Sequence, residues 1–219
     1  MLTCLLVDIP SDHLAALGIG EPRAGQRHIG ILYRARAGNP PRFLHLAWHL
    51  NLRDNDNLPT KYRCALLRDV PTLLHPTIVA QCKRSAEVDT LQGLPYGFGY
   101  KPTTVHRKSD GGALVIEGAS GLTCATFVLA ILQVANVQLV DLSTWMDREG
   151  DDSWKEAIIA QLAAAGASEE HMAAVRDNKH EVRVRPEDVA GAATEVLRPV
   201  SFEPAVQKGL QILRELRTP

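Results

Sequence analysis

The most constraining feature of this 219-residue sequence is the segment 122–135, LTCATFVLAILQVA, which is its most apolar helix candidate. A helix that is apolar on every side has to be buried, so the rest of the chain must cover it. Small residues at 118–121 (GASG) precede the segment, and the polar Thr123 lies near its first turn. We therefore expect a buried helix that begins after a glycine-containing turn.

The residues around this segment predict an α+β fold. The first half of the chain contains short strand-like apolar runs, whereas apolar residues recur at helical spacing in the second half. Two of the runs are joined by the turn-forming residues 37–41 (AGNPP), which favour a hairpin, and the polar run 53–57 is expected to be a loop. The expected strands are 2–7, 27–36, 42–50, 60–68 and 113–117, and the expected helices are 76–88, 122–135, 153–165, 168–178, 186–197 and 204–217.

Length and charge limit the organisation of the chain and the kind of partner it has. A chain of 219 residues is expected to form one principal domain, residues 1–145, with a helical extension at 146–219. The 24 basic and 25 acidic residues leave a net charge of −1, which argues against binding to nucleic acid. The arginines of the extension are expected to be surface residues; they are Arg183, Arg185, Arg198 and Arg214.

Nothing in the sequence predicts a membrane span or a cleavable signal peptide. No run of 18 apolar residues lacks a charge, and Asp8 and Pro10 interrupt the apolar N-terminus, which has no basic start. A cytoplasmic location is expected, or alternatively that of an effector exported without a cleavable signal. Four cysteines without a C-x-x-C pair indicate neither a zinc ribbon nor a disulfide framework.

Cys124 is the cysteine with the clearest chemical potential, because it falls in the first turn of the apolar helix. The unpaired N–H groups and the positive dipole end of a helix N-terminus stabilise a thiolate, and they can also hold a developing oxyanion. An ordinary buried cysteine would show the same local sequence. The other three cysteines are expected to be packing residues.

Three histidines in the expected hairpin could supply the base that a catalytic thiol needs. His28 begins the first strand, and His45 and His49 lie on one face of the second, so His28 could meet one of them across the sheet. The spacing of His45 and His49 also permits a metal site, but no glutamate accompanies them. The remaining histidines show no such pattern; they are His13, His75, His106, His171 and His180.

Taken together, these residues resemble a known family. The segment HIGILY at 28–33, followed by a hairpin into RFLHL at 42–46, resembles the opening of the circularly permuted NlpC-like thiol enzymes, a papain-fold group that includes relatives of lecithin–retinol acyltransferase. The segment LTCATFV at 122–128 resembles the family's cysteine motif, with Thr123 in place of the frequent asparagine. The resemblance covers residues 26–135, about half of the chain.

The resemblance implies a papain-like permuted NlpC-type domain with a small antiparallel sheet, and it assigns roles to its residues. Cys124 is expected to be the nucleophile, His28 the general base and His45 the orienting third residue, with His49 as the alternative. Tyr96, from the upstream tyrosine region, is the candidate oxyanion donor. No metal or organic cofactor is expected.

The expected activity is hydrolysis of a peptide or isopeptide amide through a covalent acyl-enzyme. Two alternatives remain open: a thiol acyltransferase or thioesterase that acts on lipid or acyl substrates, and a non-enzymatic interaction module. In either case the C-terminal helices could dock a protein partner.

Overall fold

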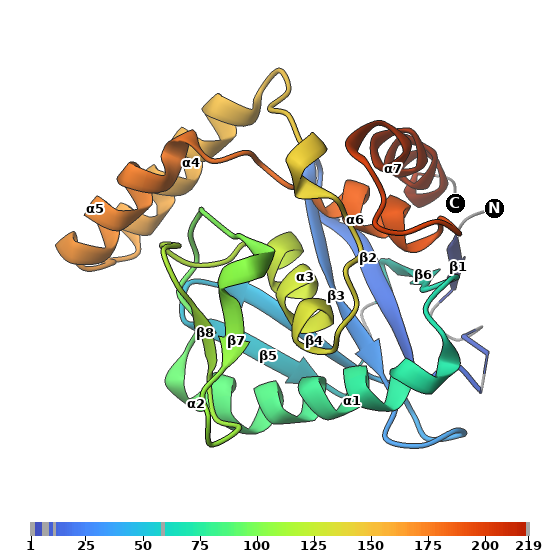
Figure 1. The fold of residues 1–219 in the computed structure, drawn as a ribbon. Helices are drawn as coiled ribbons and strands as arrows, with labels where there is room; N and C mark the ends of the chain where they lie inside the picture. The colour runs from blue at the N-terminus through green and yellow to red at the C-terminus, as the bar shows by residue number, and fades with distance from the viewer. Residues whose placement is uncertain (1–2, 6–8, 11, 58–59, 218–219) are drawn as a thin grey trace.

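The frame of the molecule is a six-stranded antiparallel sheet (Figure 1), seen in a computed structural model that describes residues 3–5, 9–10, 12–57 and 60–217. The strand order is β1-β6-β2-β3-β4-β5, and a two-stranded ribbon lies apart from it. The strands of the large sheet are β1 (Thr3–Leu5), β2 (Ala15–Arg23), β3 (Gln26–Tyr33), β4 (Arg42–Trp48), β5 (Asn51–Asn55) and β6 (Tyr62–Leu66), and those of the ribbon are β7 (Val105–Arg107) and β8 (Leu114–Ile116).

Helices cover one face of this sheet, and a pair of helices projects from one end (Figure 1). The apolar helix α3 packs against β3 and β4, while α6 packs against β2, β3 and α3. The projecting pair is α4 and α5, which stands above the edge where α3 begins. The helices are α1 (His75–Arg84), α2 (Thr90–Gln92), α3 (Cys124–Val134), α4 (Asp151–Ala164), α5 (Glu169–Asp177), α6 (Pro186–Ala193) and α7 (Phe202–Leu216), and a π-helical segment (Ser85–Asp89) joins α1 to α2.

The main hydrophobic core is continuous across the boundary expected at residues 145/146. Ile29 and Ile31 from β3 and Phe127 from α3 belong to the same buried cluster as Val189 and Ala190 from α6. A second, smaller cluster lies on the opposite face of the sheet. Because α6 fills the space beside α3, the C-terminal region contributes to the burial that α3 requires.

The α+β class is confirmed, and most expected elements are present with shifted ends. The sheet is larger than expected, because two strands were not anticipated. β2 was missed since Gly18 and Gly20 weaken its strand pattern; a Cβ atom at Gly20 would lie 2.6–2.8 Å from the Tyr62 ring, so the neighbouring ring occupies that space. The expectation of a loop at 53–57 was wrong, because Asn51–Asn55 forms the polar edge strand β5.

The last helices also differ in extent from the expected ranges. α6 ends at Ala193 rather than at residue 197, because the chain leaves the helix at Thr194 and reaches Pro199 soon after. Among the residues that the structure describes, no helix combines the length and the apolar character needed to cross a membrane.

Candidate active site

Cys124 is the first residue of α3, as the sequence predicted. Thr123 caps the helix: its Oγ1 accepts a hydrogen bond of 3.2 Å from the Thr126 backbone N–H, and the Thr126 hydroxyl accepts one of 2.8 Å from the Thr123 backbone N–H. This reciprocal pair is a capping box made by two threonines, and it fixes the point where the helix begins. The position of the Cys124 side chain is thereby fixed as well.

Tyr96 lies beside Cys124 because a short extended segment pairs with the residue two places before the cysteine. The Leu122 N–H donates to the Pro95 carbonyl (3.0 Å), and the Gly97 N–H donates to the Leu122 carbonyl (3.2 Å). The Cys124 backbone N–H acts on the Tyr96 hydroxyl and lowers its pKa, but burial, the larger effect, raises that pKa well above its usual value. Tyr96 is therefore a neutral hydrogen-bond donor at neutral pH.

His28 and His45 meet across β3 and β4. The Nε2 atom of His28 lies 2.7 Å from the Nδ1 atom of His45, and their rings are inclined at 80°. Gly30 makes this approach possible, because a Cβ atom there would lie 2.6 Å from both the His45 Cβ and the Leu44 carbonyl oxygen. The His45 ring also stacks on Phe43, with centroids 4.7 Å apart, which holds its orientation.

Asn55 extends this pair, and sequence reasoning missed it. Its Nδ2 atom lies 3.2 Å from the His45 Nε2 atom. Nothing in the sequence indicated this contact, because Asn55 lies in β5, which was expected to be a loop. The pairing of His45 with Arg53 and of Phe43 with Asn55 brings β5 alongside β4. The side chains of His28, His45 and Asn55 thus form one hydrogen-bonded row.

His49, the alternative third residue, lies in a different place. β4 has a bulge between Leu46 and Trp48 and ends there, so His49 does not continue the face that carries His45. Its Nδ1 accepts a hydrogen bond from the Tyr96 N–H (3.2 Å), and its ring lies 4.4 Å from that of His171. His171, which the sequence pattern did not single out, also lies near Tyr96: its Nε2 is 3.0 Å from the Tyr96 carbonyl oxygen.

Burial keeps the Cys124 thiol and the imidazoles of His28 and His45 neutral. It raises the pKa of the Cys124 thiol to about 11, against the opposing effect of the backbone N–H groups of Ile29 and Ala125. Burial also lowers the pKa of His28 to about 3, with a further contribution from His45. The pKa of His45 falls to about 4 through burial and the charge of Arg53. At neutral pH the site therefore holds a thiol and two neutral imidazoles.

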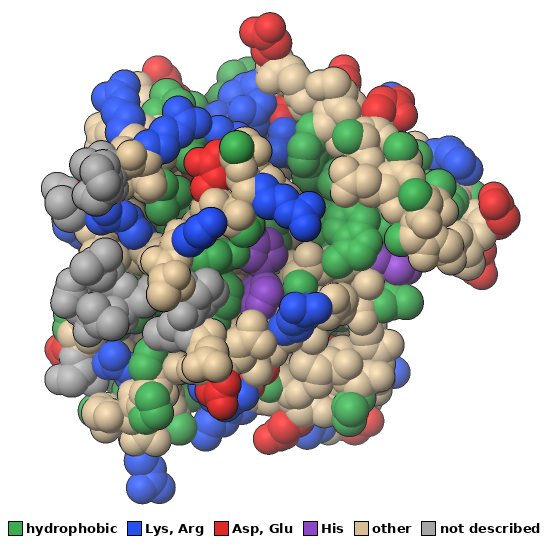
Figure 2. All heavy atoms as spheres, turned by 180° about the vertical axis from the view of Figure 1, so that it is seen from behind, with side chains coloured by type: hydrophobic (Ala, Val, Ile, Leu, Met, Phe, Trp, Pro, Cys, Tyr) green, Lys and Arg blue, Asp and Glu red, His purple; other side chains and the backbone are tan. Residues whose placement is uncertain are grey.

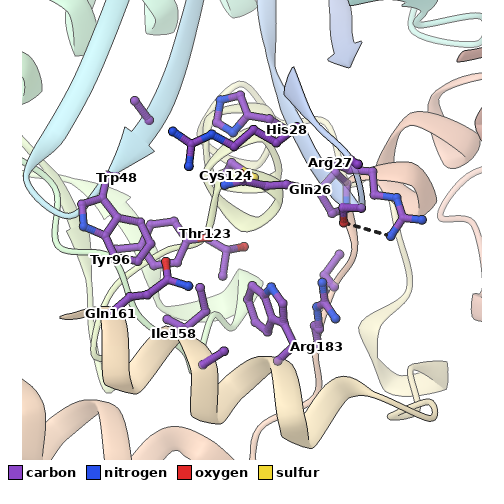
Figure 3. Close-up of a pocket in the computed structure, with 18 residues that line it drawn as sticks. Gln26, Arg27, His28, Trp48, Tyr96, Thr123, Cys124, Ile158, Gln161 and Arg183 are labelled. Carbon is purple, nitrogen blue, oxygen red and sulfur yellow. Dashed lines mark hydrogen bonds between the residues drawn. The ribbon is translucent and has the colours of Figure 1, made fainter. Parts of the chain in front are cut away.

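Cys124 and His28 open into one cavity of about 510 Å³. Figure 3 shows His28 above Cys124 at the end of α3, with Ile158 and Gln161 pointing from α4 toward them. Among the described residues no hydrogen bond joins the Cys124 thiol to the His28 ring, so proton transfer between them requires a closer approach. Figure 2 shows the opening from behind, with histidine side chains in a hollow and basic side chains around it.

Arg183 lines this cavity, so the expectation that it is a surface residue was wrong. Its guanidinium lies 3.8 Å from the centroid of the Trp154 ring and forms an ion pair of 2.9 Å with the buried Asp151. Only 14% of its side chain is exposed. Both contacts are made with α4, so α4 and the segment before α6 complete a wall that the sequence pattern did not predict.

His49 lies apart from the His28–His45 pair, because it contacts Tyr96 instead. Within the part of the chain that the structure describes, no three His, Cys, Asp or Glu side chains lie together in a way that could hold a metal ion.

Comparison with known proteins finds no match to this chain among protein-family models, curated proteins or solved structures.

Proposed function

We propose that this protein is a cysteine-dependent amide hydrolase of the permuted NlpC-like, papain-fold kind. One observation carries the proposal: Cys124 at a helix N-terminus and His28 line the same cavity, and the second histidine contacts the base through a 2.7 Å hydrogen bond. A nucleophile, a base and a group that orients the base are the components of thiol catalysis.

The hydrogen-bonded row determines which nitrogen of His28 can accept the thiol proton. Because Nε2 of His28 faces His45, Nδ1 is the ring atom left to exchange a proton with Cys124. That atom can accept the thiol proton when each N–H in the row donates away from the sulfur, from His28 to His45 and from His45 to the Asn55 side-chain oxygen. This direction requires the Asn55 amide to present Oδ1 rather than Nδ2 to His45.

The reaction has two halves. Cys124 passes its proton to His28 while its sulfur attacks the amide carbonyl carbon; the C–N bond then breaks, and His28 protonates the departing amine. Water next attacks the thioester, the carboxylic acid leaves, and the proton taken from water returns to the sulfur through His28. In this mechanism the Tyr96 hydroxyl and the Cys124 backbone N–H, which lie together, hold the oxyanion in both halves.

The cavity favours a polar amide over a lipid acyl chain. Arg23, Arg27, Arg183, Gln26 and Gln161 contribute to its lining, beside the aromatic rings that flank Cys124. Transfer of the same thioester to an amine or an alcohol would require an acceptor in place of water, and it would use the same residues.

Turnover of mixed fluorogenic peptide amides tests the proposal. The wild-type protein should release fluorophore, Cys124→Ala should abolish release, and the matched variant Cys4→Ala should leave it unchanged. In parallel, iodoacetamide at pH 7 should label Cys124 faster than the half-buried Cys4. Equal hydrolysis by the wild-type protein and Cys124→Ala, or preferential labelling of Cys4, would overturn the proposal.

A further inference from the structure

The cavity beside Cys124 carries an unbalanced positive charge. Its lining includes Arg23, Arg27 and Arg183 but no aspartate or glutamate. The whole chain has a net charge of −1, so this is a local concentration of one sign rather than a property of the composition. A cavity lined by one sign of charge attracts ligands of the other sign.

The three arginines are not equivalent. The charge of Arg183 is partly balanced, because it shares the Asp151 carboxylate with Arg185, each at 2.9 Å. Arg183 therefore forms a wall that is held over the Trp154 ring. Its contribution to ligand binding is shape and hydrogen bonding more than net charge.

Arg23 and Arg27 supply the charge that has no counterpart. Arg23 is the last residue of β2 and Arg27 is the second residue of β3, and among the described residues neither has an ion pair. Among the described residues, the Arg27 guanidinium makes one hydrogen bond, from Nη1 to the Gly25 carbonyl at 3.4 Å. The other terminal N–H groups of this guanidinium can therefore donate to an anion in the cavity, and a guanidinium binds carboxylate and phosphate oxygens through such groups.

Arg27 also immediately precedes His28 in β3 and lines the cavity with Cys124 (Figure 3). On the other side of the cysteine, Trp48 and Tyr96 form an aromatic wall, with ring centroids 4.8 Å apart. The cavity thus has a cationic end and an aromatic end, and the nucleophile lies between them. Its volume of about 510 Å³ falls in the range of small-ligand sites.

We propose that Arg27 and Arg23 form an anion-binding subsite, so that the substrate is an amide carrying a carboxylate or a phosphate close to the bond that is cleaved. The claim that the bound anion is a substrate rests on the proposed function. The anion-binding subsite itself rests only on the arginines. An acidic peptide is the simplest molecule of this kind.

Tryptophan fluorescence tests the subsite without any need for catalysis, because Trp48 and Trp154 line the cavity. The probes are three small amides: N-acetylglutamate α-amide, N-acetyl-O-phosphoserine α-amide and the neutral N-acetylglutamine α-amide. At low salt, at least one anionic probe should bind about tenfold more tightly than the neutral one, and the preference should weaken as salt is added. The tighter of the two anions identifies the group.

Matched variants identify the arginines that bind the anionic probe. Arg27→Gln, alone or with Arg23→Gln, should remove the preference for the anion, whereas Arg36→Gln should keep it, because Arg36 is an exposed arginine in the loop after β3 and does not line the cavity. Equal binding of the neutral and anionic probes, no binding of any probe, or a preference that survives the double variant would overturn the proposal.

The test separates this proposal from the function on which it builds. Cys124→Ala should bind the anionic probe as the wild-type protein does, since the subsite does not use the sulfur. Anion binding by a protein without hydrolytic activity would reject the proposed function and leave the subsite standing. Hydrolysis of neutral and acidic amides at equal rates, with no anion binding, would do the reverse.

Discussion

The Nε2 atom of His28 lies 2.7 Å from the Nδ1 atom of His45, although the two residues are 17 positions apart in the chain. The contact joins β3 to β4 at the place where Gly30 leaves room for the second ring. It ties the tautomer of one imidazole to that of the other, because one nitrogen of the pair must donate and the other must accept.

Removal of either histidine should slow the reaction of Cys124 with iodoacetamide at pH 7, and to different extents. His28→Ala removes the proposed base and should lower the rate by about tenfold to a hundredfold. His45→Ala removes only the group that orients the base and should have a smaller effect. His106→Ala, a half-exposed histidine in β7, is the control and should react like the wild-type protein. A rate in His28→Ala equal to that of the control would contradict the assignment.

Asn55 should control the direction of the hydrogen-bonded row. Asn55→Leu removes the partner of His45 and should slow Cys124 alkylation by about fivefold, the equivalent of one hydrogen bond. Asn55→Asp provides only acceptors, which fixes the N–H groups so that Nδ1 of His28 is free. It should therefore keep the rate or raise it, and it should displace the pH profile to higher pH because a carboxylate stabilises a charged imidazole. Asn57→Asp, an exposed position on the same segment, should change neither property.

Gly30→Ala should destabilise the protein by about 1–3 kcal/mol, because its methyl group would overlap both the Leu44 carbonyl and the His45 side chain. The separation of β3 from β4 should also slow Cys124 alkylation. Gly25→Ala is the comparison: nothing lies within 4 Å of a Cβ there, but its φ of 76° makes the change cost about 1 kcal/mol. Urea unfolding at neutral pH measures both changes, and equal losses would show that the contact is unimportant.

Acid should destabilise the protein through its two buried histidines. Their pKa values are lowered to about 3 and about 4, below the value of 6.5 for an exposed imidazole. Between pH 6.5 and about 4 the unfolded chain therefore binds more protons than the folded one, so stability falls as the pH is lowered through this range. Replacement of both His28 and His45 by Gln should flatten the decline seen in urea unfolding.

One carboxyl group has the opposite effect on the pH dependence of stability. Burial raises the pKa of Asp188 to about 6, so this group stabilises the fold as pH falls between 6 and 3.8. It is present in both proteins and cancels in the comparison. An equally steep decline in the double variant would show that the two histidines are not the cause.

Local patterns were sufficient to predict most of the longer helices of this chain but not all of its strands. The apolar run that begins α3 and the periodicity of α4, α5 and α7 lie within each segment, so the sequence predicted their positions closely. β2 and β5 could not be read in this way, because their residues suit a strand only beside particular neighbours. Gly20 faces the Tyr62 ring, and Asp54 in β5 accepts hydrogen bonds from Tyr33 and Arg42.

The residues of the candidate site also differ in whether a local sequence pattern could predict them. Cys124, His28 and His45 were found from sequence because a helix start and a hairpin are local features. Asn55 and Arg183 were missed because their positions depend on which strand pairs with β4 and on where α4 packs. The polar partners of a site often come from segments distant in the sequence, and no spacing rule reveals them.

The cavity joins Arg27 to Arg183, so its walls come from segments that are far apart in the sequence. During synthesis, Cys124, His28 and His45 emerge from the ribosome well before the segment that closes the cavity. A nascent chain therefore carries its most reactive atom without the enclosure that selects a ligand. Synthesis of the segment that contains Arg183, rather than of Cys124, therefore sets the moment at which the cavity is complete.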